Sequence, residues 1–145
     1  MAVRIPVLIG TAGLVADEVF LLPNDGHDII VGRSRSCPIS LRRVRQYLEA
    51  PPGTRDNDHD FNTVSRKHVR LVIHSGVASV EDLSSNGTWC NDEPVHAPRN
   101  IDLNQGPCTL RLGTREQFRL QLMDDSDPMV QGKKAIGADG LAFDD

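Results

Sequence analysis

The sequence has little of several features that would mark other classes of protein. Aromatic residues make up only 4% of its 145 residues, so valine, leucine and isoleucine must form most of the core. No apolar run approaches the roughly 18 residues of a membrane span. The first residues do not resemble a signal peptide, so we expect a cytoplasmic protein with no membrane partner. The length suits one hydrophobic core rather than two ordinary domains.

Cysteine is also sparse. The three cysteines, Cys37, Cys90 and Cys108, form no CxxC pair and are odd in number. A secreted disulfide framework is usually dense in cysteine and even in count, so we expect reduced thiols. At least two of the three are expected to be buried and inert.

Charge is unevenly distributed along the chain. The formal net charge is −4, from 16 basic and 20 acidic residues. Residues 32–72 nevertheless carry nine basic and four acidic residues, so the rest of the chain is strongly acidic. A basic segment in an acidic protein indicates a local anionic ligand, although a solvated charged loop would have the same composition. The acidic remainder argues against a nucleic-acid partner.

Short runs rich in valine, isoleucine and leucine, separated by turn residues, dominate the sequence. In the last run, Phe118, Leu120 and Leu122 alternate with polar residues, which is the period of a half-buried strand. Many short strands punctuated by glycine, asparagine and proline favour an all-β fold, either a sandwich or a barrel. The runs that predict strands are residues 3–9, 18–22, 28–32, 69–74, 78–83, 108–113 and 117–123.

One segment, over about residues 40–62, breaks this β pattern. Leu41, Val44 and Leu48 have the spacing of one face of a short helix over residues 41–50. A Pro-Pro-Gly sequence should end the helix, and the polar residues after it predict a loop. We therefore expect a helix-bearing insertion inside a β domain.

The C-terminal stretch differs in composition from the rest. Residues 124–145 hold six acidic residues, two lysines and isolated apolar residues without periodicity. Such a segment predicts an acidic, flexible tail rather than a second domain. The domain itself is expected to span residues 1–123.

Three short polar clusters each lie where a predicted strand begins or ends. They are Gly32-Arg33-Ser34, Ser65-Arg66-Lys67-His68 and Ser84-Ser85-Asn86-Gly87-Thr88. Arginine offers a planar fork of donors that suits phosphate, a hydroxyl group can add a further hydrogen bond, and an asparagine amide can hold a peptide backbone. Each cluster alone has an ordinary structural explanation, because a serine can cap a turn and Asn-Gly is a tight-turn sequence.

Taken in this order, the clusters resemble a forkhead-associated (FHA) domain, a module that binds phosphothreonine peptides. The family pattern of GR, then SxxH, then NGTxxN appears here as Gly32-Arg33, Ser65 to His68, and Asn86 to Asn91. The resemblance covers roughly residues 1–123 and implies an FHA-like β-sandwich of about eleven strands, whose loops at one end hold the phosphopeptide. The distance in sequence from Arg33 to Ser65 is longer than is usual for the family, because the insertion lies between them.

The resemblance also implies a role for individual residues. Arg33 and Ser65 would contact the phosphate, and Arg66 would add a second positive group or reach the peptide backbone. Ser85 would bond near the threonine methyl group, while Asn86 would hold the peptide main chain. The residues implied to support the site by shaping its loops are Gly32, His68, Gly87, Thr88 and Asn91. The other arginines of the insertion, Arg42, Arg43 and Arg45, are interpreted as its solvated face, although they could read acidic or doubly phosphorylated sequences.

Other functions fit the sequence less well. Ser65, His68 and Asp82 have the residue types of a serine hydrolase, but no nucleophile elbow surrounds Ser65, and we expect no catalysis. Alternating acids in residues 56–60 resemble the start of an EF-hand loop, but its sixth and twelfth positions lack the required Gly and Glu. No histidine spacing indicates zinc, so we expect neither a metal nor a cofactor.

The resemblance implies a phosphothreonine-peptide recognition module that acts as an adaptor or regulator in Ser/Thr kinase signalling. The implied partner is a phosphothreonine-containing protein, a Ser/Thr kinase or its substrate. The alternative is a phosphate-independent FHA scaffold for protein–protein assembly. The insertion favours a second surface for protein–protein contact, as the scaffold alternative requires. The complete set of Arg33, Ser65 and Asn86 favours phosphopeptide binding.

Overall fold

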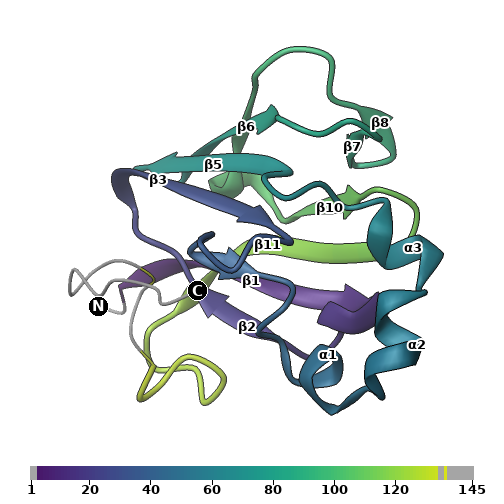
Figure 1. Ribbon diagram of the computed structural model, residues 1–145. Coiled ribbons are helices and arrows are strands. Elements are labelled where there is room, and N and C mark those ends of the chain that lie inside the picture. Colours follow the sequence, from purple (N-terminus) through teal and green to yellow (C-terminus); the bar gives the residue numbers. More distant parts are fainter. Residues whose placement is uncertain (1–2, 134–135, 137–145) are drawn as a thin grey trace.

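The computed structural model describes residues 3–133 and residue 136, and these residues form two β-sheets packed face to face (Figure 1). The first sheet has the order β2 (Val19–Leu21), β1 (Arg4–Ala12), β11 (Glu116–Asp124), β10 (Cys108–Leu112), β7 (Thr88–Cys90), β8 (Glu93–Pro94). The second has the order β4 (Ile39–Ser40), β3 (Asp25–Gly32), β5 (Val69–His74), β6 (Val77–Asp82), β9 (Arg99–Asp102). The described part of the chain is thus a sandwich of eleven strands, and the fold expected from the sequence is confirmed.

The core lies between the two sheets and consists of the apolar residues that alternate along the strands. In β10 and β11, buried Leu110 lies opposite buried Phe118, and Cys108 lies opposite Leu120. Each large apolar side chain buried in this way stabilises the fold by about 1.5–3 kcal/mol. All three cysteines are buried and form no disulfide, and the sequence predicts at least two of them to be buried. None of the helices in the described part is long and apolar enough to span a membrane.

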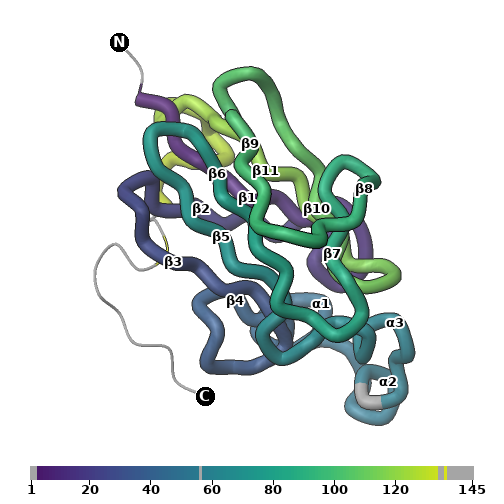
Figure 2. The backbone as a smooth tube through the Cα atoms, turned by 90° about the horizontal axis from the view of Figure 1, so that it is seen from above, coloured from purple at the N-terminus to yellow at the C-terminus, as the bar shows by residue number. Residues whose placement is uncertain are grey.

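The insertion contains three short helices: α1 (Arg45–Glu49), α2 (Pro52–Asp56) and α3 (His59–Asn62). Figure 2 shows them gathered at one end of the sandwich. The prediction of a polar loop after the first helix is wrong, because two local signals start helices there. Pro52 occupies a first-turn position that needs no N–H donor, and the Asp58 carboxylate accepts a hydrogen bond of 3.0 Å from the Phe61 N–H at the start of α3.

The single helix face predicted from Leu41, Val44 and Leu48 does not form, because Leu41 and Val44 are buried whereas Leu48 is 59% exposed. The helix begins only at Arg45, so the helical period does not extend back to Leu41. Tyr47 is buried instead and stacks on Phe61, with ring centroids 5.0 Å apart. This aromatic pair joins α1 to α3 and gives the insertion a small core of its own.

The first part of the predicted acidic tail lies against the sandwich. Val130 is buried and packs with Val7, Ile9 and Leu21, and the backbone N–H of Ile136 donates to the Leu21 carbonyl at 2.8 Å. This part of the segment is therefore packed rather than free. The rest of the predicted tail, residues 134–135 and 137–145, lies outside the described residues.

Candidate functional site

Two of the three polar clusters are joined through their backbones at the end of β3. The Arg33 N–H donates to the Ser65 carbonyl and the Ser34 N–H donates to the Arg66 carbonyl, both at 3.0 Å. The His68 N–H in turn donates to the Val31 carbonyl at 2.9 Å. These bonds fix Arg33 beside Ser65 although 32 positions of sequence, including the insertion, separate them.

Gly32 is required by this close approach. A Cβ atom at Gly32 would lie 2.1 Å from the Arg66 carbonyl oxygen and 3.0 Å from the His68 nitrogen. No side chain fits into that space, because real Cβ atoms essentially never approach so closely. The glycine of the GR pair therefore sets the distance between β3 and the loop before β5.

His68 joins the second cluster to the third. Its side chain is fully buried, and its Nδ1 atom accepts a hydrogen bond of 2.9 Å from the Ser65 backbone N–H. Because Nδ1 is an acceptor, the ring proton lies on Nε2, which donates to the Gly87 carbonyl at 2.7 Å. Both ring nitrogens thus bond to backbone groups, and neither contacts the Ser65 hydroxyl. The arrangement that a serine hydrolase needs is not assembled here.

Burial lowers the pKa of His68 from its ordinary 6.5, against the opposing effects of the Gly87 carbonyl and the Asp82 carboxylate. Below pH 6.5 the unfolded chain binds a proton that the folded protein excludes. The stability that neutral His68 provides is therefore complete above about pH 6.5 and is lost as the pH falls toward the lowered pKa, at a rate of at most about 1.4 kcal/mol per pH unit. We expect the free energy of unfolding, measured by urea denaturation between about pH 5 and pH 7, to fall more steeply for the wild type than for His68→Gln.

The comparison with His68→Gln isolates the contribution of His68 titration to the pH dependence of stability. Burial raises the pKa of the Glu116 carboxyl, so its titration acts on stability in the opposite direction, but both proteins share it. Equal slopes in the two proteins would show that His68 does not titrate in this way.

The third cluster is ordered by a carboxylate that the sequence analysis did not include in the site. Asp82 Oδ1 accepts hydrogen bonds from the Ser84 N–H, the Ser84 hydroxyl at 2.6 Å and the Thr88 hydroxyl at 2.8 Å. The Ser84 oxygen also accepts from the Gly87 N–H at 2.7 Å. The signal for this group in the sequence is the short-range spacing Asp-x-Ser-x-x-x-Thr. At this spacing one carboxylate can accept hydrogen bonds from several donors of a turn.

Ser65 and Asn86 connect the second and third clusters at their exposed side. The Ser65 oxygen accepts a hydrogen bond of 3.0 Å from the Ser85 N–H, which leaves the hydroxyl proton free to be donated to a ligand. Asn86 Nδ2 donates to the Thr63 carbonyl at 3.0 Å, and the residue is otherwise exposed. Because its amide is anchored on one side, Asn86 presents its remaining donor and acceptor in a fixed direction.

These loops surround an open hollow of about 530 Å³ at this end of the sandwich. Arg33, Ser65, Arg66 and Ser85, four of the five residues assigned to ligand binding, share this hollow, while Asn86 lies beside it in the same turn. The other three lining residues were not predicted from the sequence. The full lining is Arg33, Ser34, Ser65, Arg66, Lys67, Leu83 and Ser85.

The supporting residues are divided between this end and a more distant position. Gly32, His68, Gly87 and Thr88 belong to the hydrogen-bonded loops just described. Asn91 instead has a positive φ of 51° and exchanges hydrogen bonds with the backbone of Thr109, at 2.8 and 3.0 Å. It fastens the turn after β7 to β10 and does not contact the hollow.

The hollow is strongly positive. Arg33 donates through Nε to the Val64 carbonyl, and this bond directs the two terminal nitrogens of the guanidinium outward. Burial, with repulsion from Arg42 and Arg66, lowers the pKa of Arg33, although an arginine stays charged at neutral pH. Within the described residues, no salt bridge involves any of these three arginines. An anion in the hollow would therefore be attracted by several cations without displacing a carboxylate.

The described residues contain no group of three histidine, cysteine or acidic side chains that could hold a metal ion. The hollow presents cations and hydroxyl groups. Such a set suits a tetrahedral oxyanion on a flexible chain, with the hydroxyl and amide groups beside it.

The chain is similar to known proteins in both sequence and fold. The sequence profile described as FHA domain matches residues 29–113. No curated protein matches the chain in sequence. Among solved structures, the FHA domain of an Arabidopsis thaliana hypothetical protein is similar with a TM-score of 0.60 and 21% identity over 93% of each chain. The N-terminal FHA domain of S. cerevisiae Rad53p, in complex with a phosphothreonine peptide, is similar with a TM-score of 0.56 and 17% identity, over 82% of this chain and 94% of that one.

Proposed function

The chain belongs to the FHA-domain family, and from this we propose that it recognises phosphothreonine in a peptide and acts as an adaptor or regulator in Ser/Thr kinase signalling. The observation that carries the proposal is the hollow in which Arg33, Ser65, Arg66 and Ser85 meet. The residues come from three separate parts of the chain, and a purely structural role would not require them to converge on an exposed surface.

In this proposal the phosphate is held by charge-assisted hydrogen bonds. Phosphorylation adds about −1.5 to −2 charges and three strong acceptor oxygens to a threonine. The terminal nitrogens of Arg33 and the hydroxyl proton of Ser65 are donors in fixed positions, and Arg66 and Lys67 are exposed cations at the same hollow. Because the loops are already ordered by His68 and Asp82, binding costs little loop ordering.

The peptide itself would be held next to the phosphate. Asn86 has one amide donor and its carbonyl oxygen available for the peptide main chain, and Ser85 would bond near the threonine methyl group. The partner we propose is a phosphothreonine-containing protein of the cytoplasm, either a Ser/Thr kinase or its substrate. The module would bind this partner without catalysing a reaction and without a metal, a cofactor, a nucleic acid or a membrane.

The test is fluorescence-polarisation binding to a degenerate phosphothreonine peptide library, with unphosphorylated threonine and phosphoserine libraries as matched controls. We expect binding to the phosphothreonine library alone, because neither control offers both the phosphate and the methyl group. Equal binding to the phosphorylated and unphosphorylated libraries, or no binding by the folded protein, would contradict the proposal.

The alternative, a phosphate-independent scaffold, is less well supported by the surface of the insertion. Within the described part of the insertion, Leu48 is the one exposed large apolar residue. A single exposed leucine is ordinary on a protein surface and does not form a docking patch. A scaffold would also not need the group of cations that surrounds the hollow.

A further inference from the structure

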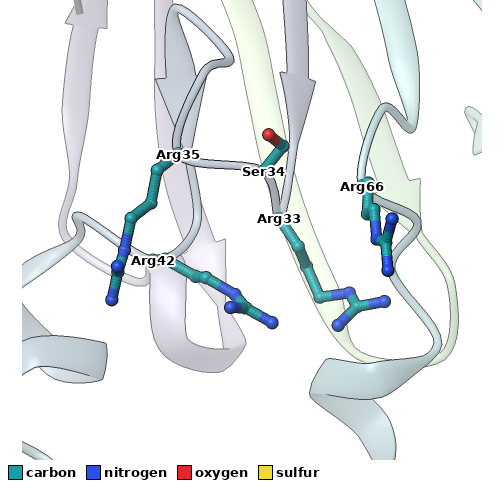
Figure 3. A pocket seen from close by; sticks show the side chains of 5 residues that line it. All are labelled: Arg33, Ser34, Arg35, Arg42 and Arg66. Carbon is teal, nitrogen blue, oxygen red and sulfur yellow. The ribbon is translucent and has the colours of Figure 1, made fainter. Parts of the chain in front are cut away.

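A second hollow adjoins the first and is formed almost entirely by arginines. It has a volume of about 390 Å³ and is lined by Arg33, Ser34, Arg35, Arg42 and Arg66. Figure 3 shows Arg33 between Arg42 on one side and Arg66 on the other, with the guanidinium groups extending toward the same side of the loops. Arg33, Ser34 and Arg66 belong to both hollows, so the two form one continuous basic surface.

Arg42 is held in this position by the fold. Gly32 of β3 pairs with Ser40 of β4, and the Leu41 N–H donates to the Gly32 carbonyl at 2.9 Å. The Ser40 hydroxyl oxygen accepts a hydrogen bond of 3.2 Å from the Arg42 N–H. The backbone of Arg42 is thus fixed to the same strand end that carries Arg33, and Arg42 precedes α1 instead of lying on the face of the helix as predicted.

The neighbouring arginines of the insertion behave differently. Arg43 donates to the Cys37 carbonyl and so has a structural partner. Arg45 is exposed and lines neither hollow. Only Arg42 of the three contributes to the surface beside Arg33, a distinction that the spacing in the sequence does not show.

The charge of this surface exceeds what one phosphate needs. Arg33, Arg35, Arg42, Arg66 and Lys67 provide five cations, and no salt bridge involves any of them in the described part of the chain. The Nε atom of Arg42 is shielded from solvent and has no hydrogen-bond partner among these residues. One phosphate carries at most about two negative charges, so about three of the five cations remain without an anion. Repulsion between neighbouring arginines, such as that of Arg42 and Arg66 on Arg33, opposes folding. The binding of a further anion would relieve this repulsion.

We propose that the second hollow binds a second phosphoryl group of the same ligand, so that the preferred ligand is a peptide carrying phosphothreonine and another phosphorylated residue near it. This inference rests on the proposed function and adds the class of ligand. Because the hollows share Arg33 and Arg66, the second phosphate should lie near the phosphothreonine in sequence, within a few residues of an extended peptide that advances about 3.3–3.6 Å per residue.

The experiment compares peptide sets that differ in one group. The first set is a degenerate library with a single fixed phosphothreonine. The second adds one phosphoserine fixed at each flanking position within about four residues, and the third places glutamate at the same positions. Each set is measured by fluorescence polarisation at constant ionic strength with the wild type, Arg42→Gln and Arg45→Gln. Arg45→Gln is the matched control, because it removes the same charge from the same segment but not from either hollow.

We expect a second phosphate at one or more positions to strengthen binding to the wild type about tenfold or more. Arg42→Gln should remove most of this gain and change binding of the singly phosphorylated library less than about threefold, and Arg45→Gln should leave the gain intact. Should Arg42→Gln fail to fold, as judged by thermal unfolding, Arg35→Gln is measured in its place with the same expectation.

Other results would overturn the inference in distinguishable ways. No gain from the second phosphate, or an equal gain in Arg42→Gln, would remove the second phosphoryl site and leave the proposed function standing. An equal gain from glutamate would assign the hollow to acidic residues instead of phosphate. Failure of the singly phosphorylated library to bind would instead count against the proposed function itself, and the inference would fall with it.

Discussion

Replacement of Arg33 with alanine is expected to weaken binding of a phosphothreonine peptide about tenfold to a few hundredfold, because hydrogen bonds to charged groups contribute about 1.5–3 kcal/mol each. Arg33 lies where the two hollows meet. Arg33 and Arg66 are the two cations that line both hollows. The measurement is the dissociation constant of the best phosphothreonine peptide from the library, for the wild type and Arg33→Ala.

The fold should survive this change. Arg33 is only partly buried, and the one hydrogen bond that its side chain makes within the described part of the chain, to the Val64 carbonyl, contributes about 1 kcal/mol. Arg45→Ala is the charge-matched control and should bind the peptide within about threefold of the wild type. Arg33→Lys retains the charge but not the planar fork, so its affinity should lie between those of the wild type and Arg33→Ala. Undiminished binding by folded Arg33→Ala would exclude Arg33 as the phosphate contact.

Replacement of Gly32 with alanine is expected to destabilise the whole domain by about 3 kcal/mol, which lowers the melting temperature of a chain of this size by roughly 10 °C. The added Cβ atom would lie 2.1 Å from the Arg66 carbonyl oxygen and 2.7 Å from its carbonyl carbon. These are backbone atoms of the loop that carries Ser65, so they cannot rotate away as a side chain would. The loop must shift, and phosphopeptide binding should decrease with it.

The matched control is Gly53→Ala. Gly53 lies in α2, and a Cβ atom there would meet nothing within 4 Å. Alanine favours a helix over glycine by about 1 kcal/mol, so Gly53→Ala should be neutral or slightly stabilising. Thermal and urea unfolding of both variants provide the comparison. If Gly32→Ala is as stable as Gly53→Ala, the close packing of β3 against the loop before β5 is not what requires glycine.

The sequence predicted the strands of the core well where apolar residues alternate. The predicted runs over residues 69–74 and 117–123 coincide closely with β5 (Val69–His74) and β11 (Glu116–Asp124). The strands that were missed, β4, β7, β8 and β9, have between two and four residues. So short a strand contains too few residues to show an alternation, and pairing with a neighbouring strand decides whether it forms.

The candidate site was predicted by its motifs rather than by any physical pattern. Arg33, Ser65 and Ser85 were named from the order of three clusters, and the fold brings them to one hollow. Asp82 was missed because its importance lies in the hydrogen bonds that it accepts from Ser84 and Thr88, which a strand pattern does not reveal. The proposed role of the hollow in binding is tested by the peptide measurements described above.

The sequence alone determined the class of fold, the loops that carry the polar clusters and the excess of positive charge in residues 32–72. Only the tertiary structure decided which side chains of the insertion face inward and which cations line the two hollows. Tyr47 is buried in place of Leu48, and Arg42, not Arg43 or Arg45, lies beside Arg33. The physical reason is that the hydrophobic period and the secondary-structure propensity depend on residues that are neighbours in sequence. The direction of a side chain in an irregular turn is set instead by hydrogen bonds to strands that are distant in sequence. Here the pairing of β4 with the end of β3 has this effect.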